Sequence, residues 1–262
     1  MAFLQQPFGQ SCYECFGDGP PLLLLNGLGF SRWSWSWQWR AMPELRLIAI
    51  ENRGVGGSDL GDAPFELVDL ADDAVRLLDH LEIPRTWVWG VSMGGMIAQE
   101  LALKYPERCA GLILGCTMCG GPEATFMSAN TLEFMAGLAR EGLTDASVRQ
   151  AMRLNFSDTV AAEVVEAYVP LRMQNNPPLP TWTRQREATA RFDVSSRLHQ
   201  YRGRALLMHG GDDAVVPSAN LRQLQQLLPQ AETRVFPAAR HLFWIEHAQE
   251  VNARVRDFVC AS

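Results

Sequence analysis

The stretch Thr86-Trp87-Val88-Trp89-Gly90-Val91-Ser92-Met93-Gly94-Gly95 decides the fold, because an apolar run passes directly into a segment of helical character. Within it, Gly90 to Gly94 have the pattern Gly-x-Ser-x-Gly. A strand-to-helix turn this sharp leaves no room for Cβ atoms at Gly90 and Gly94, and it pushes the Ser92 hydroxyl out over the strand end. We therefore predict a nucleophilic serine at the N-terminus of a helix.

Apolar runs and amphipathic segments alternate on both sides of this stretch. The runs that predict strands are Met1 to Phe8, Ser11 to Phe16, Leu22 to Leu25, Leu45 to Ile50, Thr86 to Val91, Leu112 to Thr117, Ala205 to His209 and Thr233 to Phe236. The periodic segments that predict helices are Leu67 to Leu81, Met93 to Lys104, Ala219 to Leu228 and Ala248 to Val259. Strand, helix and strand at such spacing form parallel βαβ units, so we expect an α/β fold with a mostly parallel sheet covered on both faces.

The strand signal disappears between Gly120 and Leu198, where helical segments follow one another. These segments are Ala124 to Arg140, Ala146 to Leu154, Thr159 to Met173 and Thr181 to Arg191. The proline-rich stretch Asn175 to Pro180 breaks two of them. We therefore predict a core domain from residues 1–119 and 199–262, with residues 120–198 inserted as a helical cap.

Composition excludes several classes of protein. The net charge of −6 and the absence of a Lys/Arg cluster argue against a nucleic-acid partner. No stretch approaches the ~20 apolar residues of a membrane span, and Met1 to Gln10 lack the pattern of a signal peptide. The cysteines are most simply interpreted as reduced thiols of a cytoplasmic protein, and the pairs Cys12/Cys15 and Cys116/Cys119 lie too far apart for a compact zinc site. We expect no metal.

A serine hydroxyl needs a base to accept its proton, and the chain offers five histidines. Four of them fall in predicted helices, in a strand or at the end of the cap, where each has a structural role: His80, His199, His209 and His247. Only His241 lies in a loop after the last predicted strand. His241 is therefore the expected general base.

The carboxylate that orients the base should follow the strand Ala205 to His209, where the chain supplies Asp212 and Asp213. We expect Asp213 to fix the imidazole tautomer and Asp212 to cap the turn. Two backbone N–H groups are expected to stabilise the oxyanion. Met93 lies at the start of the helix, and Leu28 lies in the glycine-rich loop Asn26-Gly27-Leu28-Gly29 after an early strand.

The order Ser, Asp, His and the local motifs resemble the α/β-hydrolase superfamily over essentially the whole chain. Asn52-Arg53-Gly54-Val55-Gly56-Gly57-Ser58-Asp59 is similar to the family's D-x-R-G-x-G-x-S loop, with Glu51 where Asp is usual. Asp213 to Pro217 resembles its acid loop, and Arg240-His241 through Glu246-His247 resembles its histidine loop. Asn26 departs from the family, since many members carry His there.

This resemblance implies the α/β-hydrolase fold and an activity close to small serine esterases and enol-lactonase-like members. Ser92 as nucleophile distinguishes the chain from members that open epoxides or remove halide, which carry Asp at that position. The triad would cleave an ester or lactone without a cofactor. Two alternatives stay open: hydrolysis of a carbon–carbon bond in a diketone-type substrate, and a ligand sensor that signals by cap movement.

Apolar side chains near the predicted site suggest an apolar substrate pocket. The run Trp33, Trp35, Trp37 and Trp39 follows the oxyanion loop, and such aromatics are more often core than pocket. The residues expected in the pocket wall are Phe30, Trp33, Met127, Phe134, Trp182 and Leu242.

Overall fold

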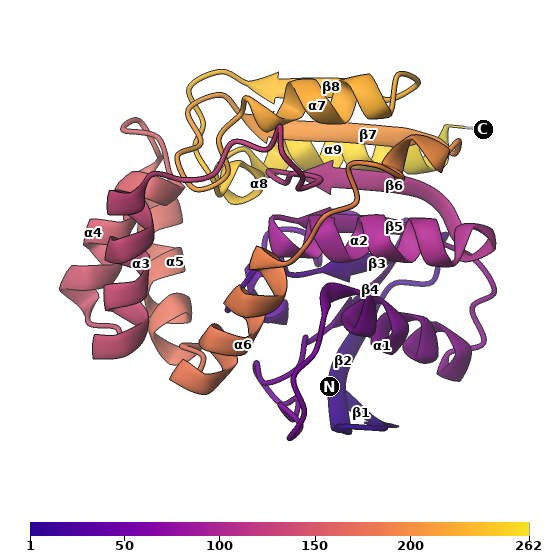
Figure 1. Ribbon diagram of the computed structural model, residues 1–262, viewed down its shortest axis with the longest axis horizontal. Coiled ribbons are helices and arrows are strands. Elements are labelled where there is room, and N and C mark those ends of the chain that lie inside the picture. Colours follow the sequence, from indigo (N-terminus) through magenta and orange to yellow (C-terminus); the bar gives the residue numbers. More distant parts are fainter. Residues whose placement is uncertain (262) are drawn as a thin grey trace.

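The computed structural model describes residues 1–261 and is built around one eight-stranded sheet (Figure 1). The strand order is β1-β2-β4-β3-β5-β6-β7-β8, in which β2 runs antiparallel to β1 and β4 and all other neighbours are parallel. The strands are β1 Ala2–Gln6, β2 Gly9–Phe16, β3 Pro21–Leu25, β4 Arg46–Ile50, β5 Thr86–Val91, β6 Cys109–Gly115, β7 Ala205–Gly210 and β8 Glu232–Phe236. The predicted α/β fold is confirmed.

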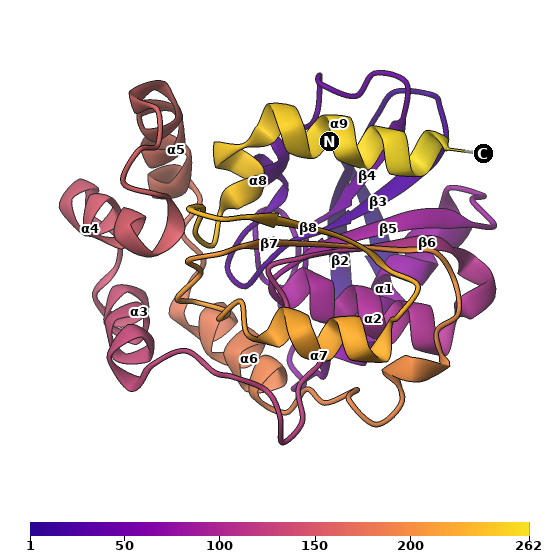
Figure 2. The same cartoon turned by 90° about the horizontal axis from the view of Figure 1, so that it is seen from above.

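Helices cover both faces of this sheet, as Figure 2 shows. Helices α1 (Leu67–His80), α2 (Met93–Lys104) and α7 (Asn220–Leu227) pack on one face, and α8 (Phe243–Glu246) and α9 (Ala248–Cys260) pack on the other. The apolar side chains therefore divide into two cores, one on each side of the sheet.

Strand β3 shows why an unbroken apolar run forms a central strand. Leu23 and Leu25 pack into the core under α1 and α2, whereas Leu22 and Leu24 pack into the core under α9. All four side chains are fully buried. Because side chains alternate between the two faces and both faces are covered, every position of the strand must be apolar.

The strand boundaries differ from the sequence prediction where the backbone turns. The predicted strand Met1 to Phe8 is wrong beyond Gln6, because Pro7 has no N–H to donate and Gly9 takes a φ of 133°. The chain reverses there, and β1 and β2 form a hairpin. The predicted strand Leu112 to Thr117 ends early, at Gly115, because Cys116 takes a φ of 40°.

The tryptophan run folds into the short 3₁₀ helix η1 (Arg32–Trp35). Trp35 is fully buried between Trp89, with ring centroids 4.8 Å apart, and Trp244, with centroids 6.4 Å apart. It is a core residue, which agrees with the more frequent role of such aromatics.

Four helices lie between β6 and β7, within residues 120–198, which are called the cap below. They are α3 Ala129–Glu141, α4 Asp145–Asn155, α5 Ala162–Gln174 and α6 Leu179–Ala190. Figures 1 and 2 show them together at one end of the sheet, where the parallel strands have their carboxyl ends. The proline-rich stretch separates α5 from α6, as predicted.

Within residues 1–261, no helix has the combined length and apolarity that crossing a membrane requires. All six cysteines carry free thiols. On β2, Cys12 is buried and Cys15 is exposed, because residues three apart on a strand face opposite sides.

Candidate active site

Ser92 occupies the sharp turn between β5 and α2. Its backbone has φ 55° and ψ −122°, a conformation that a residue other than glycine rarely adopts. A Cβ added to Gly90 would lie 2.1 Å from the carbonyl oxygen of Gly94, and one added to Gly94 would lie 2.0 Å from that of Leu25. Both glycines are therefore required by the turn that exposes Ser92 at the carboxyl edge of the sheet.

The acid and the base come from the loops that follow β7 and β8. Nδ1 of His241 donates a hydrogen bond of 2.8 Å to Oδ2 of Asp213. The other carboxylate oxygen accepts from the N–H groups of Val215 at 2.8 Å and Val216 at 2.9 Å. Asp213 is thus held on both oxygens, and Nε2 of His241 is the ring nitrogen that can accept a proton. Asp212 is exposed.

Electrostatics at His241 reflect two opposing causes. Burial is the largest single influence and disfavours the charged imidazolium, but the Asp213 carboxylate and the neighbouring Cys116 together hold the pKa of His241 well above its ordinary value. His209 lies nearby, with Nε2 3.6 Å from Oδ2 of Asp213, and donates to the carbonyl oxygen of Val216 at 2.9 Å. Burial lowers the pKa of His209, which leaves it neutral and structural.

Cys116 is a third neighbour of the pair and was singled out in the sequence only for its spacing to Cys119. Its Sγ, one oxygen of Asp213 and one nitrogen of His241 all lie within 4.8 Å of one another. A thiolate, a carboxylate and an imidazole are groups that can bind a metal ion. Here, however, Asp213 and His241 are hydrogen-bonded to each other. Burial raises the pKa of the Cys116 thiol, so the thiol is neutral beside the imidazole.

The two expected oxyanion donors lie beside Ser92. A Cβ placed on Gly27 would contact Cβ of Ser92 at 3.4 Å, so the loop after β3 passes directly over the serine. Among residues 1–261, the N–H groups of Leu28 and Met93 have no hydrogen-bond acceptor. Because α2 begins at Met93, its N–H also lies at the positive end of the helix dipole. Both groups can bind a developing oxyanion.

Two cap residues that the sequence did not single out hold this loop. The N–H of Gly29 donates to Oε1 of Gln185 at 2.9 Å, and its carbonyl oxygen accepts from Nη1 of Arg172 at 2.9 Å. Gln185 is fully buried and also donates from Nε2 to the carbonyl oxygen of Arg53 at 3.1 Å. No motif marks either residue, because they reach the loop only through packing of the cap.

The cap also holds the histidine loop. The N–H of Leu242 donates to the carbonyl oxygen of Asn155 at 2.8 Å. Glu246 accepts from the N–H of Ser157 at 3.0 Å and from its hydroxyl. The cap is therefore fastened on both sides of Ser92, to the oxyanion loop and to the loop that carries His241.

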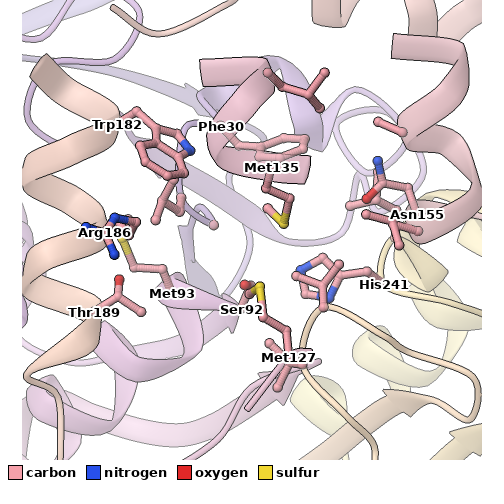
Figure 3. Close-up of a pocket in the computed structure, with 18 of the residues that line it drawn as sticks. Phe30, Ser92, Met93, Met127, Met135, Asn155, Trp182, Arg186, Thr189 and His241 are labelled. Atoms are coloured by element: carbon pink, nitrogen blue, oxygen red, sulfur yellow. The ribbon is translucent and has the colours of Figure 1, made fainter. Parts of the chain in front are cut away.

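Ser92 and His241 line a cavity of about 390 Å³ between the sheet edge and the cap (Figure 3). Four of the side chains expected in the pocket wall line it: Phe30, Met127, Trp182 and Leu242. The wall is mainly apolar and includes five methionines, which are flexible and adapt to ligands of different shape.

Trp33 and Phe134 were also expected in the wall, and the structure places both outside it. Trp33 is buried behind Phe30, with ring centroids 5.3 Å apart. On α3, Met135 lines the cavity in place of Phe134, because adjacent positions of a helix point about 100° apart.

Comparison with known proteins agrees with this geometry. Residues 20–248 match the family described as alpha/beta hydrolase fold. The chain is 28% identical over 251 residues to poly(3-hydroxyalkanoate) depolymerase of Ectopseudomonas oleovorans, covering 91% of this chain and 84% of that protein. It is 30% identical over 250 residues to 3-oxoadipate enol-lactonase 2 of Acinetobacter baylyi, covering 93% and 90%. A thermophilic esterase from Thermogutta terrifontis superposes with a TM-score of 0.82 at 26% identity, covering 98% and 97% of the two chains.

Proposed function

The chain belongs to the α/β-hydrolase family, and from this premise we propose that it is a serine hydrolase that cleaves a small carboxylic ester or lactone. The observation that carries the proposal is the 2.8 Å hydrogen bond between His241 and Asp213, at the edge of the cavity that Ser92 and His241 line. A nucleophile, a base and an orienting acid on three separate loops form the arrangement that acyl transfer requires.

In the first half of the reaction, Oγ of Ser92 attacks the carbonyl carbon of the substrate while Nε2 of His241 takes the hydroxyl proton. The carbonyl oxygen becomes an oxyanion, which the N–H groups of Leu28 and Met93 stabilise. Asp213 stabilises the imidazolium through Nδ1. When the tetrahedral intermediate collapses, His241 gives the proton to the leaving alcohol, and an acyl-Ser92 ester is left.

In the second half, water attacks the acyl-enzyme while Nε2 of His241 takes a proton from it. The same oxyanion donors act again, and collapse returns the proton to Oγ of Ser92 and releases the carboxylic acid. In a lactone, the alcohol stays attached to the acyl group, so one product leaves. The residues supply the nucleophile, the proton relay and the charge stabilisation, so the proposal requires no cofactor.

The names of the relatives support an ester or lactone substrate. Poly(3-hydroxyalkanoate) and an enol-lactone both contain an ester linkage, and the structurally similar Thermogutta protein is an esterase. The mainly apolar cavity fits an acyl chain. We also propose a cytoplasmic location, which the six free thiols support, and a small-molecule substrate without nucleic-acid or membrane partners.

The experiment is a panel of short esters, lactones and diketones with wild type and Ser92→Ala. We expect multiple turnover of an ester or lactone, and a loss of several orders of magnitude in Ser92→Ala with unchanged circular dichroism. A fluorophosphonate should label wild type at Ser92 alone, as peptide mass mapping can determine. Retained activity in the variant, or labelling elsewhere, would remove Ser92 from the mechanism.

The same panel separates the alternatives. Turnover restricted to diketones would replace ester cleavage by carbon–carbon bond hydrolysis. A single slow turnover, together with ligand-dependent protection of the cap from hydrogen exchange, would indicate a sensor. The hydrogen bonds that tie the cap to both catalytic loops favour the enzyme, because a cap that moved freely would disturb the site.

A further inference from the structure

The charge of the cavity wall is opposite to that of the whole chain. The protein has 29 acidic and 23 Lys and Arg residues, which gives a net charge of −6. The cavity lining nevertheless contains two arginines, Arg172 and Arg186, and no aspartate or glutamate. In a mainly apolar enclosure, such charges are screened less than on the surface and attract an anion from a greater distance.

The guanidinium of Arg172 donates hydrogen bonds within the protein. Nη1 donates to the carbonyl oxygens of Gly29 at 2.9 Å and Asn175 at 3.4 Å, and the guanidinium lies 4.8 Å from the ring centroid of Phe30. Burial lowers its pKa. Arg172 therefore serves the oxyanion loop, although its charge adds to the positive potential of the cavity.

The guanidinium of Arg186, in contrast, has no acceptor within the described part of the protein. It lies on α6, and its guanidinium is 5.6 Å from the ring centroid of Trp182, one turn earlier on the helix. Within residues 1–261, no hydrogen bond and no ion pair involves its side chain. Figure 3 shows Arg186 on the α6 wall, on the other side of Ser92 from His241 and Asn155. Its guanidinium donors are therefore available to a bound molecule.

The neighbouring arginines of this segment make the contrast clear. Arg184, on another side of α6, donates to the carbonyl oxygens of Gly61 and Asp62, and Arg191 forms an ion pair of 2.8 Å with Glu66. Each arginine that faces the core domain has acceptors there. Arg186 differs because it faces the cavity, where the protein supplies none.

We propose that the cavity takes esters or lactones that carry a carboxylate at a distance from the scissile carbonyl, and that Arg186 binds this carboxylate. The planar guanidinium matches a carboxylate through two parallel hydrogen bonds, and the ring of Trp182, 5.6 Å away, is its aromatic neighbour in the wall. The apolar wall between Ser92 and Arg186, to which Met93 contributes, holds the methylene chain that joins the two ends of the substrate. The inference rests on the proposed ester or lactone hydrolysis.

The test compares two substrates of matched length: the mono-p-nitrophenyl ester of adipic acid, which carries a free carboxylate, and the same molecule with that carboxylate methylated. Wild type should prefer the free carboxylate in kcat/KM. In Arg186→Gln this preference should fall by about tenfold to hundredfold, mainly through KM, as expected for loss of a charge-assisted hydrogen bond. Arg186→Lys should retain part of it, and Arg202→Gln, which removes an exposed charge far from the cavity, should leave it unchanged.

Titration of both esters into Ser92→Ala measures binding without turnover and separates this inference from the proposed function. Tighter binding of the free carboxylate that depends on Arg186 supports the inference. Equal binding of the two esters, or the same preference in Arg186→Gln as in wild type, overturns it even if esters are hydrolysed. If the free carboxylate binds through Arg186 but wild type hydrolyses neither ester, the proposed function is contradicted and the inference about Arg186 stands.

Discussion

The N–H of Gly29 donates a hydrogen bond of 2.9 Å to Oε1 of Gln185, and this bond joins the oxyanion loop to the cap. Leu28, the preceding residue, is the proposed oxyanion donor. The N–H of Gly29 shares a rigid peptide plane with the carbonyl group of Leu28, and the plane that carries the N–H of Leu28 is joined to it at the Leu28 Cα. Fixing Gly29 therefore leaves only the φ and ψ rotations of Leu28 to set the direction of its N–H. The cap therefore holds the residue that follows the proposed oxyanion donor.

Gln185→Leu should lower kcat by about tenfold to hundredfold, less than the loss of an oxyanion donor itself, because the donor is still present but poorly oriented. KM should change by no more than about threefold, since the loss falls on the transition state. Steady-state kinetics on a simple ester measure both. Affinity for a boronic acid, which mimics the tetrahedral intermediate, should fall in parallel with kcat.

Two further variants control this experiment. Gln185→Glu keeps an oxygen that accepts from Gly29 and should restore part of kcat, while Gln150→Leu alters an exposed glutamine of the cap helix α4 and should have no effect. If Gln185→Leu raised KM and left kcat intact, Gln185 would act on substrate binding and the link to the oxyanion loop would be refuted.

Asp213→Asn should lower kcat by roughly 10⁴, as loss of the orienting carboxylate does in serine proteases, because the amide favours the wrong imidazole tautomer. Asp212→Asn is the matched control. Its side chain is exposed, and we expect a small loss from the altered turn. Comparison of kcat for the two variants, with circular dichroism of both, decides the assignment. A larger loss at Asp212 would show that the acid is misassigned.

The pH dependence of kcat/KM should follow His241. Burial alone would lower its pKa, but Asp213 and Cys116 together hold the pKa well above the ordinary 6.5. Only the neutral imidazole accepts the Ser92 proton, so kcat/KM should rise with pH and reach half its maximum above 6.5. Asp213→Asn removes the negative charge and should lower the pKa of His241, which NMR titration can follow. An upward shift in that variant would contradict this electrostatic account.

The sequence allowed the proposed catalytic residues to be placed at the carboxyl edge of the sheet, because each follows a predicted strand there. Ser92 lies in a turn whose glycines are recognisable, and His241 is the only histidine in a loop after the last strand. The order of strands and helices in the sequence is enough to predict which edge of the sheet carries the site, because ligands of such sheets bind at the carboxyl ends of the strands. For the same reason the structure places Ser92 and His241 in the wall of one cavity, with Asp213 hydrogen-bonded to His241.

Contacts made by the cap could not be predicted in this way. Gln185 and Arg172 lie on helices with no motif, and their roles depend on how α5 and α6 pack against the loop that holds Gly29. Helical periodicity shows that α3 has an apolar face, but a shift of one position exchanges Phe134 for Met135 in the cavity wall. For Cys116, the sequence offered one indication that it lies near the site: it directly follows strand β6, at the carboxyl edge of the sheet.

The cap should set the preferred acyl length. Trp182→Ala enlarges the cavity, so kcat/KM should shift toward p-nitrophenyl esters of longer acyl chains. Phe134→Ala removes an aromatic side chain from the same cap but outside the cavity, and it should leave the profile unchanged. The measurement is kcat/KM across acyl chains of increasing length. A shift of equal size in both variants would mean that cap stability, and not the shape of the wall, controls the profile.

The turn at Ser92 should be intolerant of any side chain at Gly94, whereas a glycine of the cap should tolerate one. A Cβ at Gly94 would lie 2.0 Å from the carbonyl oxygen of Leu25, which is backbone and cannot move aside cheaply. Gly94→Ala should therefore destabilise the fold by about 1–3 kcal/mol, and it should lower kcat because α2 or the oxyanion loop must shift.

Gly137→Ala provides the opposite case, since Gly137 lies inside helix α3 and a Cβ there meets nothing within 4 Å. Alanine loses less backbone entropy than glycine in a helix, so this variant should be more stable by about 1 kcal/mol with unchanged activity. Urea unfolding followed by circular dichroism gives both free energies of unfolding. If Gly94→Ala proved as stable and as active as wild type, the close approach of α2 to the end of β3 would be wrong, and the position of Ser92 derived from it would have to be revised.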